Sequence, residues 1–250
     1  MKQVITLTTD FGDQFAVAQL HAVLVSLGFD GRVIENHSVS PFKIIEGAFE
    51  LFQITKLTPD NSVHVGVVDP GVGSSRRGIV IKTQRSWFVG PDNGLLYPAA
   101  EKESIKQAWQ LSESNISDEV SNTFHGRDIF IKAAVYITQG KQPKDFGSTS
   151  ISPEALTQVN FQSGQILHID HYGNIKIHWQ ENINAFRKLL IKTTKTAEVI
   201  PVVKTFSDVP PNTPLALLGS NGTLELAVNL TRGDEYFGVH LGEIVTIQSV

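Results

Sequence analysis

Short apolar segments alternate with longer segments of helical period along the N-terminal part of the chain. The short segments are apolar or β-branched throughout, and in the longer ones apolar side chains recur every three or four residues. Glycine or proline marks the helix ends. The pattern predicts strands over residues 4–9, 32–35 and 63–68 and helices over residues 15–28 and 41–57. This alternation favours an α/β domain with a mainly parallel sheet flanked by helices.

The pattern changes in the rest of the chain. Paired strands are predicted over residues 79–83 and 87–89, and a last long helix over residues 129–138. Residues 140–153 are rich in Gly, Pro, Ser and Lys, which is typical of a linker. Beyond it lie strand-like runs at 166–169, 175–178, 189–193, 215–218 and 244–247, and one short predicted helix at 223–230. We expect an α/β domain over residues 1–155 and a small, mostly antiparallel, barrel-like β domain over residues 156–250.

Composition restricts the chemistry that the chain can perform. The 250 residues carry 21 Lys and Arg against 25 Asp and Glu, a formal net charge of −4. No basic cluster interleaves with aromatic residues, so we expect no binding to nucleic acid or to a membrane surface. The absence of Cys excludes disulfides, Cys-ligated zinc, iron–sulfur clusters and thiol nucleophiles. The first apolar run meets Asp10 too early for a signal peptide, and no apolar stretch approaches the ~18 residues of a membrane span, so we expect a cytoplasmic protein.

Polar residues collect where the first predicted strand ends. Asp10 leaves a buried strand, and a carboxylate in that place can accept two hydrogen bonds from the vicinal hydroxyls of a ribose. A purely structural role for Asp10 is equally open. Asp13 stands directly before the helical period, where a helix N-cap is expected.

Two further turns add a guanidinium and an imidazole. Asp69 ends the third predicted strand, and the Pro and Gly residues after it fix a tight path toward Arg76 and Arg77. His125 precedes the helix predicted over 129–138. Each of these could be an ordinary turn residue. Ligands bind at the carboxyl ends of strands in such sheets, however, and a carboxylate, a guanidinium and an imidazole together can handle a proton and an anion.

The second domain has two polar clusters. Residues 170–174 read as a hairpin turn, yet their carboxylate, aromatic ring and carboxamide also suit an ammonium group, a stacked base and the edge of a purine. Residues 219–225 precede the predicted short helix. They read either as a capping box with Glu225 reaching back or as free amides that hold a carboxylate. The chain lacks the nucleophile elbow, G-x-G-x-x-G, P-loop and H-E-x-x-H motifs, which removes the usual sequence support for hydride transfer, phosphoryl transfer and zinc hydrolysis.

The order of the polar motifs resembles that of a known family. From residue 5 to about residue 230 the chain carries TTDFG, HSVSPF, VVDPGVGSSRR, GPDNG, TFHGRD, DHYGN and GSNGTLELAVN. These motifs resemble the S-adenosyl-L-methionine hydroxide adenosyltransferases, or S-adenosylmethionine hydrolases, relatives of the fluorinating and chlorinating adenosyl enzymes. The resemblance implies hydrolysis of S-adenosylmethionine to adenosine and methionine by water that attacks ribose C5′. It also implies a homotrimer with active sites at subunit interfaces, and neither a metal nor another cofactor.

The resemblance carries residue roles in the first domain by motif position. It implies that Asp69, Arg76 and His125 form the catalytic set. It further implies that Asp10 binds the ribose and that Phe42 is the aromatic residue beside it. In this reading Asp69 accepts a proton from the water, directly or through His125, while Arg76 stabilises the developing oxyanion.

The resemblance carries further roles into the second domain. It implies that Asp170 faces the methionine amino group, that Tyr172 lines the adenine slot and that Asn174 contacts the adenine edge. Ser220, with Asn221 beside it, takes the methionine-carboxylate position.

The chain differs from the halogenating relatives at three positions. They carry an aromatic hydroxyl, a hydroxyl residue and a serine where this chain has Asp69, Val72 and Gly126. A carboxylate in that place repels a halide, which favours the hydrolase branch. The loop after Asp10 is shorter than in many members, so the role of Asp13 stays open. After Asn174 the chain has Ile177-His178 instead of the frequent Thr-Asn.

Alternative functions remain at this stage. One is a nucleoside- or S-adenosylmethionine-binding regulatory protein without turnover, and another is a halogenase. A third is a metal-dependent hydrolase that would use Asp10, Asp69, Asp92 and His125 as ligands, although the sequence offers no closely spaced ligand pair.

Overall fold

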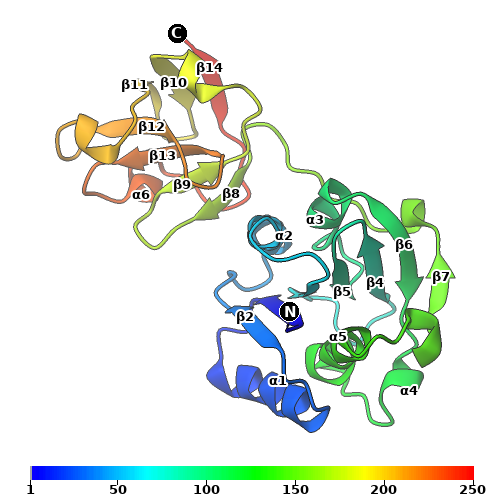
Figure 1. Ribbon diagram of the computed structural model, residues 1–250. Helices are drawn as coiled ribbons and strands as arrows, with labels where there is room; N and C mark the ends of the chain where they lie inside the picture. The colour runs from blue at the N-terminus through cyan, green and yellow to red at the C-terminus, as the bar shows by residue number, and fades with distance from the viewer. Residues whose placement is uncertain (1) are drawn as a thin grey trace. The chain divides into compact units, whose positions relative to one another are not determined.

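A computed structural model describes residues 2–250 and divides the chain into two compact units (Figure 1). The first unit ends at Val159 and the second runs from Asn160 to Val250. The boundary predicted from the sequence, between residues 155 and 156, lies a few residues earlier. Among residues 2–250, no helix is both long and apolar enough to cross a membrane.

A seven-stranded sheet organises the N-terminal unit, with the strand order β2-β1-β3-β5-β4-β6-β7. The neighbours among β2, β1, β3 and β5 are parallel, and β4, β6 and β7 continue the sheet in antiparallel pairs. The strands are β1 (Val4–Thr9), β2 (Arg32–Asn36), β3 (Val63–Val67), β4 (Gly78–Thr83), β5 (Trp87–Pro91), β6 (Ile105–Gln110) and β7 (Thr149–Ile151). The α/β class is confirmed, and the sheet is mixed, with its antiparallel strands gathered on one side.

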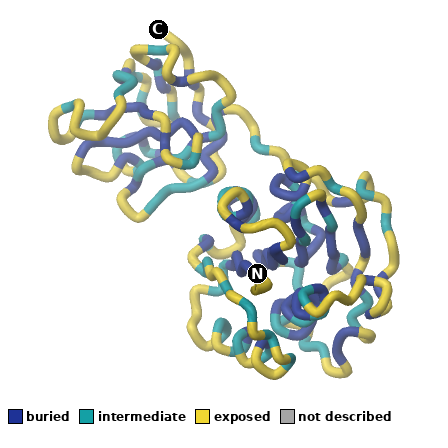
Figure 2. Tube along the Cα trace, viewed as in Figure 1, coloured by how far each residue is buried: buried dark blue, intermediate teal, exposed yellow. Residues whose placement is uncertain are grey.

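Helices cover both faces of this sheet, α1 packing against α5 and α2 against α3. They are α1 (Gln14–Ser26), α2 (Ile44–Thr55), α3 (Tyr97–Lys102), α4 (Glu113–Ile116), the π-helical turn η1 (Gly126–Phe130) and α5 (Ile131–Thr138). Val65 and Val67 pack with residues of α1 and α5, whereas Val68 packs with residues of α2 and α3. The segment is therefore buried on both faces, which explains its unbroken apolar run. Figure 2 shows buried stretches of the chain in dark blue in the interior of this unit.

The prediction of a linker over residues 140–153 is wrong. This segment contains the 3-10 turn η2 (Pro143–Phe146) and β7, and it runs into a second 3-10 turn, η3 (Pro153–Ala155). Pro143 and Phe146 are buried, and β7 pairs with β6. An edge strand needs few apolar residues, so its polar composition resembled that of a linker.

Two antiparallel sheets form the C-terminal unit, with strand orders β11-β10-β14 and β12-β13-β9-β8. Their strands are β8 (Ile166–Ile169), β9 (Ile175–Ile177), β10 (Lys188–Lys192), β11 (Ala197–Pro201), β12 (Pro214–Leu218), β13 (Leu224–Val228) and β14 (Thr246–Ser249). The short helical segments are η4 (Ile183–Ala185), η5 (Phe206–Asp208) and α6 (Gly233–Phe237). Side chains from both sheets form one apolar core, so the predicted β domain is confirmed.

The helix predicted over residues 223–230 is wrong, because β13 occupies most of this range. All five residues of β13 are buried, and the strand pairs with both β12 and β9. A short apolar run is compatible with a buried helix or a central strand, and the pairing with two neighbouring strands decides for the strand.

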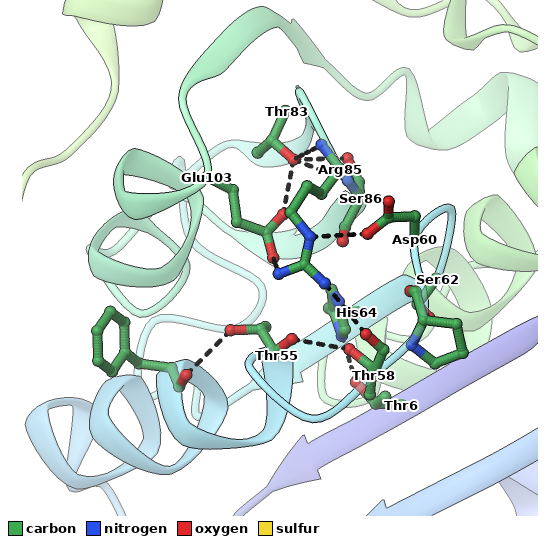
Figure 3. A network of polar contacts seen from close by, with 12 residues as sticks. Thr6, Thr55, Thr58, Asp60, Ser62, His64, Thr83, Arg85, Ser86 and Glu103 are labelled. Carbon is green, nitrogen blue, oxygen red and sulfur yellow. Dashed lines mark hydrogen bonds and ion pairs between the residues drawn. The ribbon is translucent and has the colours of Figure 1, made fainter. Parts of the chain in front are cut away.

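A polar network around the buried His64 lies at the amino end of β3, away from the carboxyl ends of the parallel strands (Figure 3). Nδ1 of His64 lies 2.8 Å from Oγ1 of Thr6, and the imidazole is fully buried. Burial lowers the pKa of His64 to about 3, and the charge of Arg85 acts in the same direction. Arg85 itself donates from Nε to Asp60 at 2.7 Å. His64 is therefore a neutral structural residue.

Candidate active site

Three turns of the N-terminal unit meet at the carboxyl end of the parallel strands. Asp10 follows β1, Asp69 lies just beyond β3, and His125 directly precedes η1. The structure thus brings together the side chains that the sequence placed at one edge of the sheet. They line one cavity of about 100 Å³, whose walls are Asp10, Phe11, Phe42, Val67, Asp69, Val72, Thr123, Phe124, His125 and Gly126.

Asp69 and Arg76 form a buried ion pair beside this cavity. Nε of Arg76 donates to both carboxylate oxygens of Asp69, at 3.0 and 2.9 Å, and Nη2 also donates to Oδ2. The two side chains are only 5% and 11% exposed, so solvent screens the pair weakly. The loop between them folds back on itself, with the N–H of Val72 donating to the Asp69 carbonyl at 3.2 Å. This turn brings residues seven positions apart into contact.

Gly73 lets the same loop lie against the segment that leads to His125. Its φ is +75°, and a Cβ placed there would lie 2.3 Å from the carbonyl oxygen of Asn122. Only glycine fits this contact, because any other side chain would push the two segments apart. The second glycine of the motif around Asp69 therefore has a packing reason that its sequence alone does not reveal.

His125 is joined to the ion pair through the guanidinium. Nη2 of Arg76 lies 3.0 Å from Nδ1 of His125, and a guanidinium can only donate. Nδ1 is therefore the acceptor, which assigns the proton of the neutral imidazole to Nε2. Oε1 of Glu113 lies 3.4 Å from the same Nδ1 and would form an ion pair only with a doubly protonated ring. Sequence reasoning did not include Glu113.

One nitrogen of the Arg76 guanidinium makes no hydrogen bond within the described residues. Its Nη1 is buried and has no hydrogen-bond partner among residues 2–250. Its Cζ lies 5.2 Å from the ring centroid of Phe130, which contributes a favourable cation–π contact. A cation in a poorly solvated position acts on a neighbouring negative charge more strongly than one in water.

Asp10 and Phe42 form another wall of the cavity. Oδ2 of Asp10 accepts the backbone N–H of Phe42 at 2.9 Å. Phe42 has a φ of 67°, unusual for a bulky residue, and the residue is 70% exposed. The hydrogen bond helps to hold this strained conformation, while Oδ1 of Asp10 can still accept hydrogen bonds from a ligand. Asp13 caps α1 instead, accepting from the N–H of Phe15 at 2.9 Å.

A larger pocket of about 600 Å³ lies within the C-terminal unit. Its walls are His171, Tyr172, Asn174, Phe206, Val228, Asn229, Leu230, Thr231 and Arg232. The structure thus places the predicted adenine contacts Tyr172 and Asn174 in one pocket. Tyr172 is 74% exposed, so its ring is free to stack on a ligand.

Asp170 belongs to the same turn, but its carboxylate accepts hydrogen bonds from groups of the protein itself. Oδ1 accepts from the N–H groups of Tyr172 and Asn174, both at 3.0 Å. Oδ2 accepts from Nδ2 of Asn174 at 3.1 Å and from Nζ of Lys176 at 3.2 Å. Burial raises the pKa of the Asp170 carboxyl, but the hydrogen bonds from Asn174 and the charge of Lys176 outweigh it and leave the pKa below its usual value. With four donors in place, this carboxylate has little capacity left for an ammonium group.

Lys176 contacts the predicted site residue Asp170, and sequence reasoning did not single it out. Its Nζ lies between Asp170 and Glu225, 3.2 Å from the first carboxylate and 3.0 Å from the second. Glu225 is thus engaged by a neighbouring strand, and the predicted capping box is wrong because no helix follows it. The signal was available in principle, since Lys176 alternates with apolar residues on a strand that pairs with Glu225.

The structure does not bring Ser220 and Asn221 into the pocket with Tyr172. Antiparallel pairing sets Ile175 opposite Leu226 and Ile177 opposite Leu224. The turn before β9 and the turn before β13 therefore lie at opposite ends of this strand pair. Because no helix follows Ser220, the argument from helix amides no longer applies to it.

Asp92 is held away from the residues that would accompany it in a metal site. Its Oδ2 accepts from Arg77, and its Oδ1 accepts from the N–H of Thr157 at 2.8 Å. Asp92 does not line the cavity of Asp10, Asp69 and His125. The geometry therefore does not assemble the four-ligand set considered for a metal-dependent hydrolase.

Comparisons with known proteins cover both units. Profiles of the SAM hydroxide adenosyltransferase N-terminal and C-terminal domains match residues 5–147 and 164–246. The chain is 34% identical over 254 residues to an (R)-S-adenosyl-L-methionine hydrolase of Salinispora arenicola, covering 96% of this chain and 95% of the relative. It is 22% identical to a fluorinase of an Actinoplanes species, covering 98% and 97%. An uncharacterized conserved protein from Thermotoga maritima superposes with a TM-score of 0.87 at 26% identity, covering 98% of this chain and 100% of that one.

Proposed function

This chain belongs to the SAM hydroxide adenosyltransferase family, and we propose that it hydrolyses S-adenosyl-L-methionine to adenosine and L-methionine. The observation that carries the proposal is one cavity lined by Asp10, Asp69 and His125. Asp69 and His125 both form hydrogen bonds with Arg76, and Asp10 lies on another wall. This arrangement offers a proton acceptor, a fixed cation and a carboxylate for a diol in one small space.

In the proposed reaction a water molecule in the cavity attacks C5′ of the ribose. The new C5′–O bond forms as the C5′–S bond breaks, the bonding electrons go to sulfur as neutral methionine, and one water proton is released. Asp69 accepts that proton, because Nδ1 of His125 already accepts from Arg76 and Nε2 carries the ring proton. His125 therefore acts as a donor that orients the water, and Arg76 stabilises its developing negative charge.

The charge balance of the reaction suits a poorly hydrated cavity. A sulfonium cation combines with an oxygen that becomes negative, so charge is destroyed on the way to the transition state. General-base assistance is worth about 10²–10⁴-fold, and alignment of the water with the C5′–S bond contributes further. The cation of Arg76 supplies charge stabilisation at Asp69 and His125, so we propose a reaction that needs no metal.

The cavity volume supports a shared site. About 100 Å³ holds a few water molecules, since each takes about 30 Å³ in the liquid, but not a whole nucleoside. Ligand pockets of drug size usually measure about 300–1,000 Å³. We propose a homotrimer in which the C-terminal unit of a neighbouring subunit completes the site, with Tyr172 and Asn174 contacting adenine. Size-exclusion chromatography with light scattering tests this, and a monomer of full activity would contradict it.

The configuration of the sulfonium sulfur in the preferred substrate can also be proposed. The Salinispora arenicola relative is named for the (R) form of the substrate. We propose the same preference here. Heating S-adenosylmethionine inverts its sulfonium and yields both epimers, so chiral chromatography of a partly digested mixture measures the preference directly. Equal consumption of the two epimers would remove this part.

The decisive assay mixes the protein with S-adenosylmethionine and follows adenosine by chromatography. We expect equimolar adenosine and methionine, unchanged by EDTA, and no 5′-chloro-5′-deoxyadenosine when chloride is added. Binding of the substrate without adenosine would support the regulatory alternative. A chlorinated product would support the halogenase, and loss of activity with EDTA would support the metal-dependent hydrolase.

A further inference from the structure

The GPDNG motif at residues 90–94 has no role in the chemistry described so far, although it lies at the same edge of the sheet as Asp69. β5 runs parallel to β3 and ends at Pro91, so Asp92 and Asn93 follow its carboxyl end. Their side chains contact opposite ends of the loop that joins Asp69 to Arg76. Asn93 contacts the residue before Asp69, and Asp92 contacts the residue after Arg76.

The first contact is a side-chain hydrogen bond to a backbone carbonyl that lies beyond the strand pairing. The ladder between β3 and β5 has its last pair at Val65 and Val89, and the ladder between β3 and β1 ends at Val67. The carbonyl of Val68 lies beyond both ladders. Nδ2 of Asn93 donates to this carbonyl at 2.8 Å and thereby fixes the peptide that leads into Asp69.

Asn93 is itself held in place by the turn. Its Oδ1 accepts the N–H of Leu95 at 3.2 Å, which makes a local Asx turn. Gly94 follows with a φ of +95°, and a Cβ there would lie 2.1 Å from Cγ2 of Val159. The hydrogen bond from Leu95 to Oδ1 therefore orients the side-chain amide of Asn93, and Nδ2 is left to donate to the Val68 carbonyl.

The second contact holds the far end of the loop. The N–H of Asp92 donates to the Arg77 carbonyl at 2.9 Å, and the Asp92 carboxylate pairs with the Arg77 guanidinium. The adjacent arginines thus diverge, Arg76 toward Asp69 and Arg77 toward Asp92. Both ends of the loop that carries the Asp69–Arg76 pair are anchored to the same motif.

We propose that Asn93 is a positioning residue that sets the direction of the Asp69 carboxylate through the Val68 carbonyl. This inference rests on the proposed hydrolysis. Because a displacement of about 1 Å in a reacting group can cost about 10²-fold in rate, loss of the brace should lower kcat strongly. Binding should change little, since Asn93 does not line the cavity.

Asn93→Asp is the sharpest variant. The aspartate keeps the size and the acceptor for Leu95, but it places an oxygen against the Val68 carbonyl where the amide donated. Asn93→Ser serves as a second variant in case the first does not fold, because serine can accept from Leu95 but is too short to reach Val68. Asn182→Asp is the matched control, since Asn182 accepts from the N–H of Asn184 in a similar turn of the C-terminal unit.

We expect Asn93→Asp and Asn93→Ser to lower kcat by about 10- to 100-fold, with the dissociation constant of adenosine within about threefold of wild type. Asn182→Asp should retain wild-type kcat. In an Asp69→Asn background, Asn93→Asp should cause no further loss, because its effect passes through Asp69.

Three results separate the possible failures. If the wild-type protein forms no adenosine, the proposed function itself is wrong. If it does and both folded Asn93 variants keep full kcat, the positioning role is wrong. Losses that multiply in the Asp69→Asn background would also overturn it, because they would show that Asn93 acts independently of Asp69.

Discussion

Replacing Asp69 by asparagine tests the proton acceptor while keeping the shape of the side chain. The amide loses the charge and the basic oxygen, although its remaining carbonyl can still accept from Arg76. Loss of general-base assistance should lower kcat by about 10²–10⁴-fold, which corresponds to about 3–5 kcal/mol of activation free energy. The Asp69 and Arg76 side chains are 5% and 11% exposed, so the loss of charge pairing should also lower the free energy of unfolding, by about 1.5–3 kcal/mol.

The assay for Asp69→Asn separates these two effects. Adenosine formation is measured under single-turnover conditions at a temperature well below the thermal midpoint of the variant, and binding of adenosine is measured by calorimetry. Asp60→Asn is the control, because it removes the charge of another aspartate paired with an arginine, at the opposite end of the sheet and 69% exposed. We expect binding to persist in Asp69→Asn. A folded variant with wild-type single-turnover rate would refute Asp69 as the base.

Two further predictions concern the cavity, and a third concerns the buried His64 at the other end of the sheet. Asp10→Ala should raise KM at least tenfold with a smaller change in kcat, because its hydrogen bonds to the ribose exist before and during the reaction; the opposite pattern in steady-state kinetics would reject a binding role. Arg76→Lys should lower kcat by at least tenfold, since an ammonium cannot contact both Asp69 and His125 in the same plane; full activity would contradict the argument. His64 stays neutral in the folded protein because its pKa is lowered from 6.5 to about 3, whereas the unfolded chain takes up a proton below pH 6.5. Urea unfolding should therefore show the wild type losing about 2 kcal/mol relative to His64→Leu between pH 7 and pH 5, and an unchanged difference would contradict a buried neutral imidazole.

The N-terminal unit could be predicted from the sequence where helix and strand periods were clear. β1, β3 and α1 follow the apolar pattern closely, and the parallel arrangement then places Asp10 and Asp69 at the same edge. The sequence predicted that the turns carrying His125 and Arg76 lie at the same edge of the sheet, but it did not predict their direct contact. The tautomer of His125 required coordinates, because it depends on which nitrogen faces the guanidinium.

The C-terminal unit was harder to predict because its strands are short. The run Leu224–Val228 contains only buried residues, and a run of that length has no decisive period. Glu225 was predicted to cap a helix, but because this run is a strand, Glu225 forms an ion pair with Lys176 instead. Asp170 was expected to face a ligand, and in the structure its own turn supplies three donors to it and Lys176 of β9 supplies a fourth. Local hydrogen bonding of this kind leaves no apolar pattern in the sequence.

The role of GPDNG also depended on three-dimensional information. Pro, Asp, Asn and Gly in this motif are typical of a turn, and Gly94 does take a positive φ. The β3–β5 ladder ends at Val65, the hydrogen bond from Asn93 to Val68 lies beyond that end, and strand ladders are visible only in the folded chain.

Hydrolysis in ¹⁸O-labelled water tests the central claim most directly, namely that water in the cavity lined by Asp69 and His125 attacks ribose C5′. Mass spectrometry of the products should find one ¹⁸O atom in the 5′-hydroxyl of adenosine and none in methionine. Adenosine without the label would contradict the account, because its 5′ oxygen would then come from a source other than the water in the cavity.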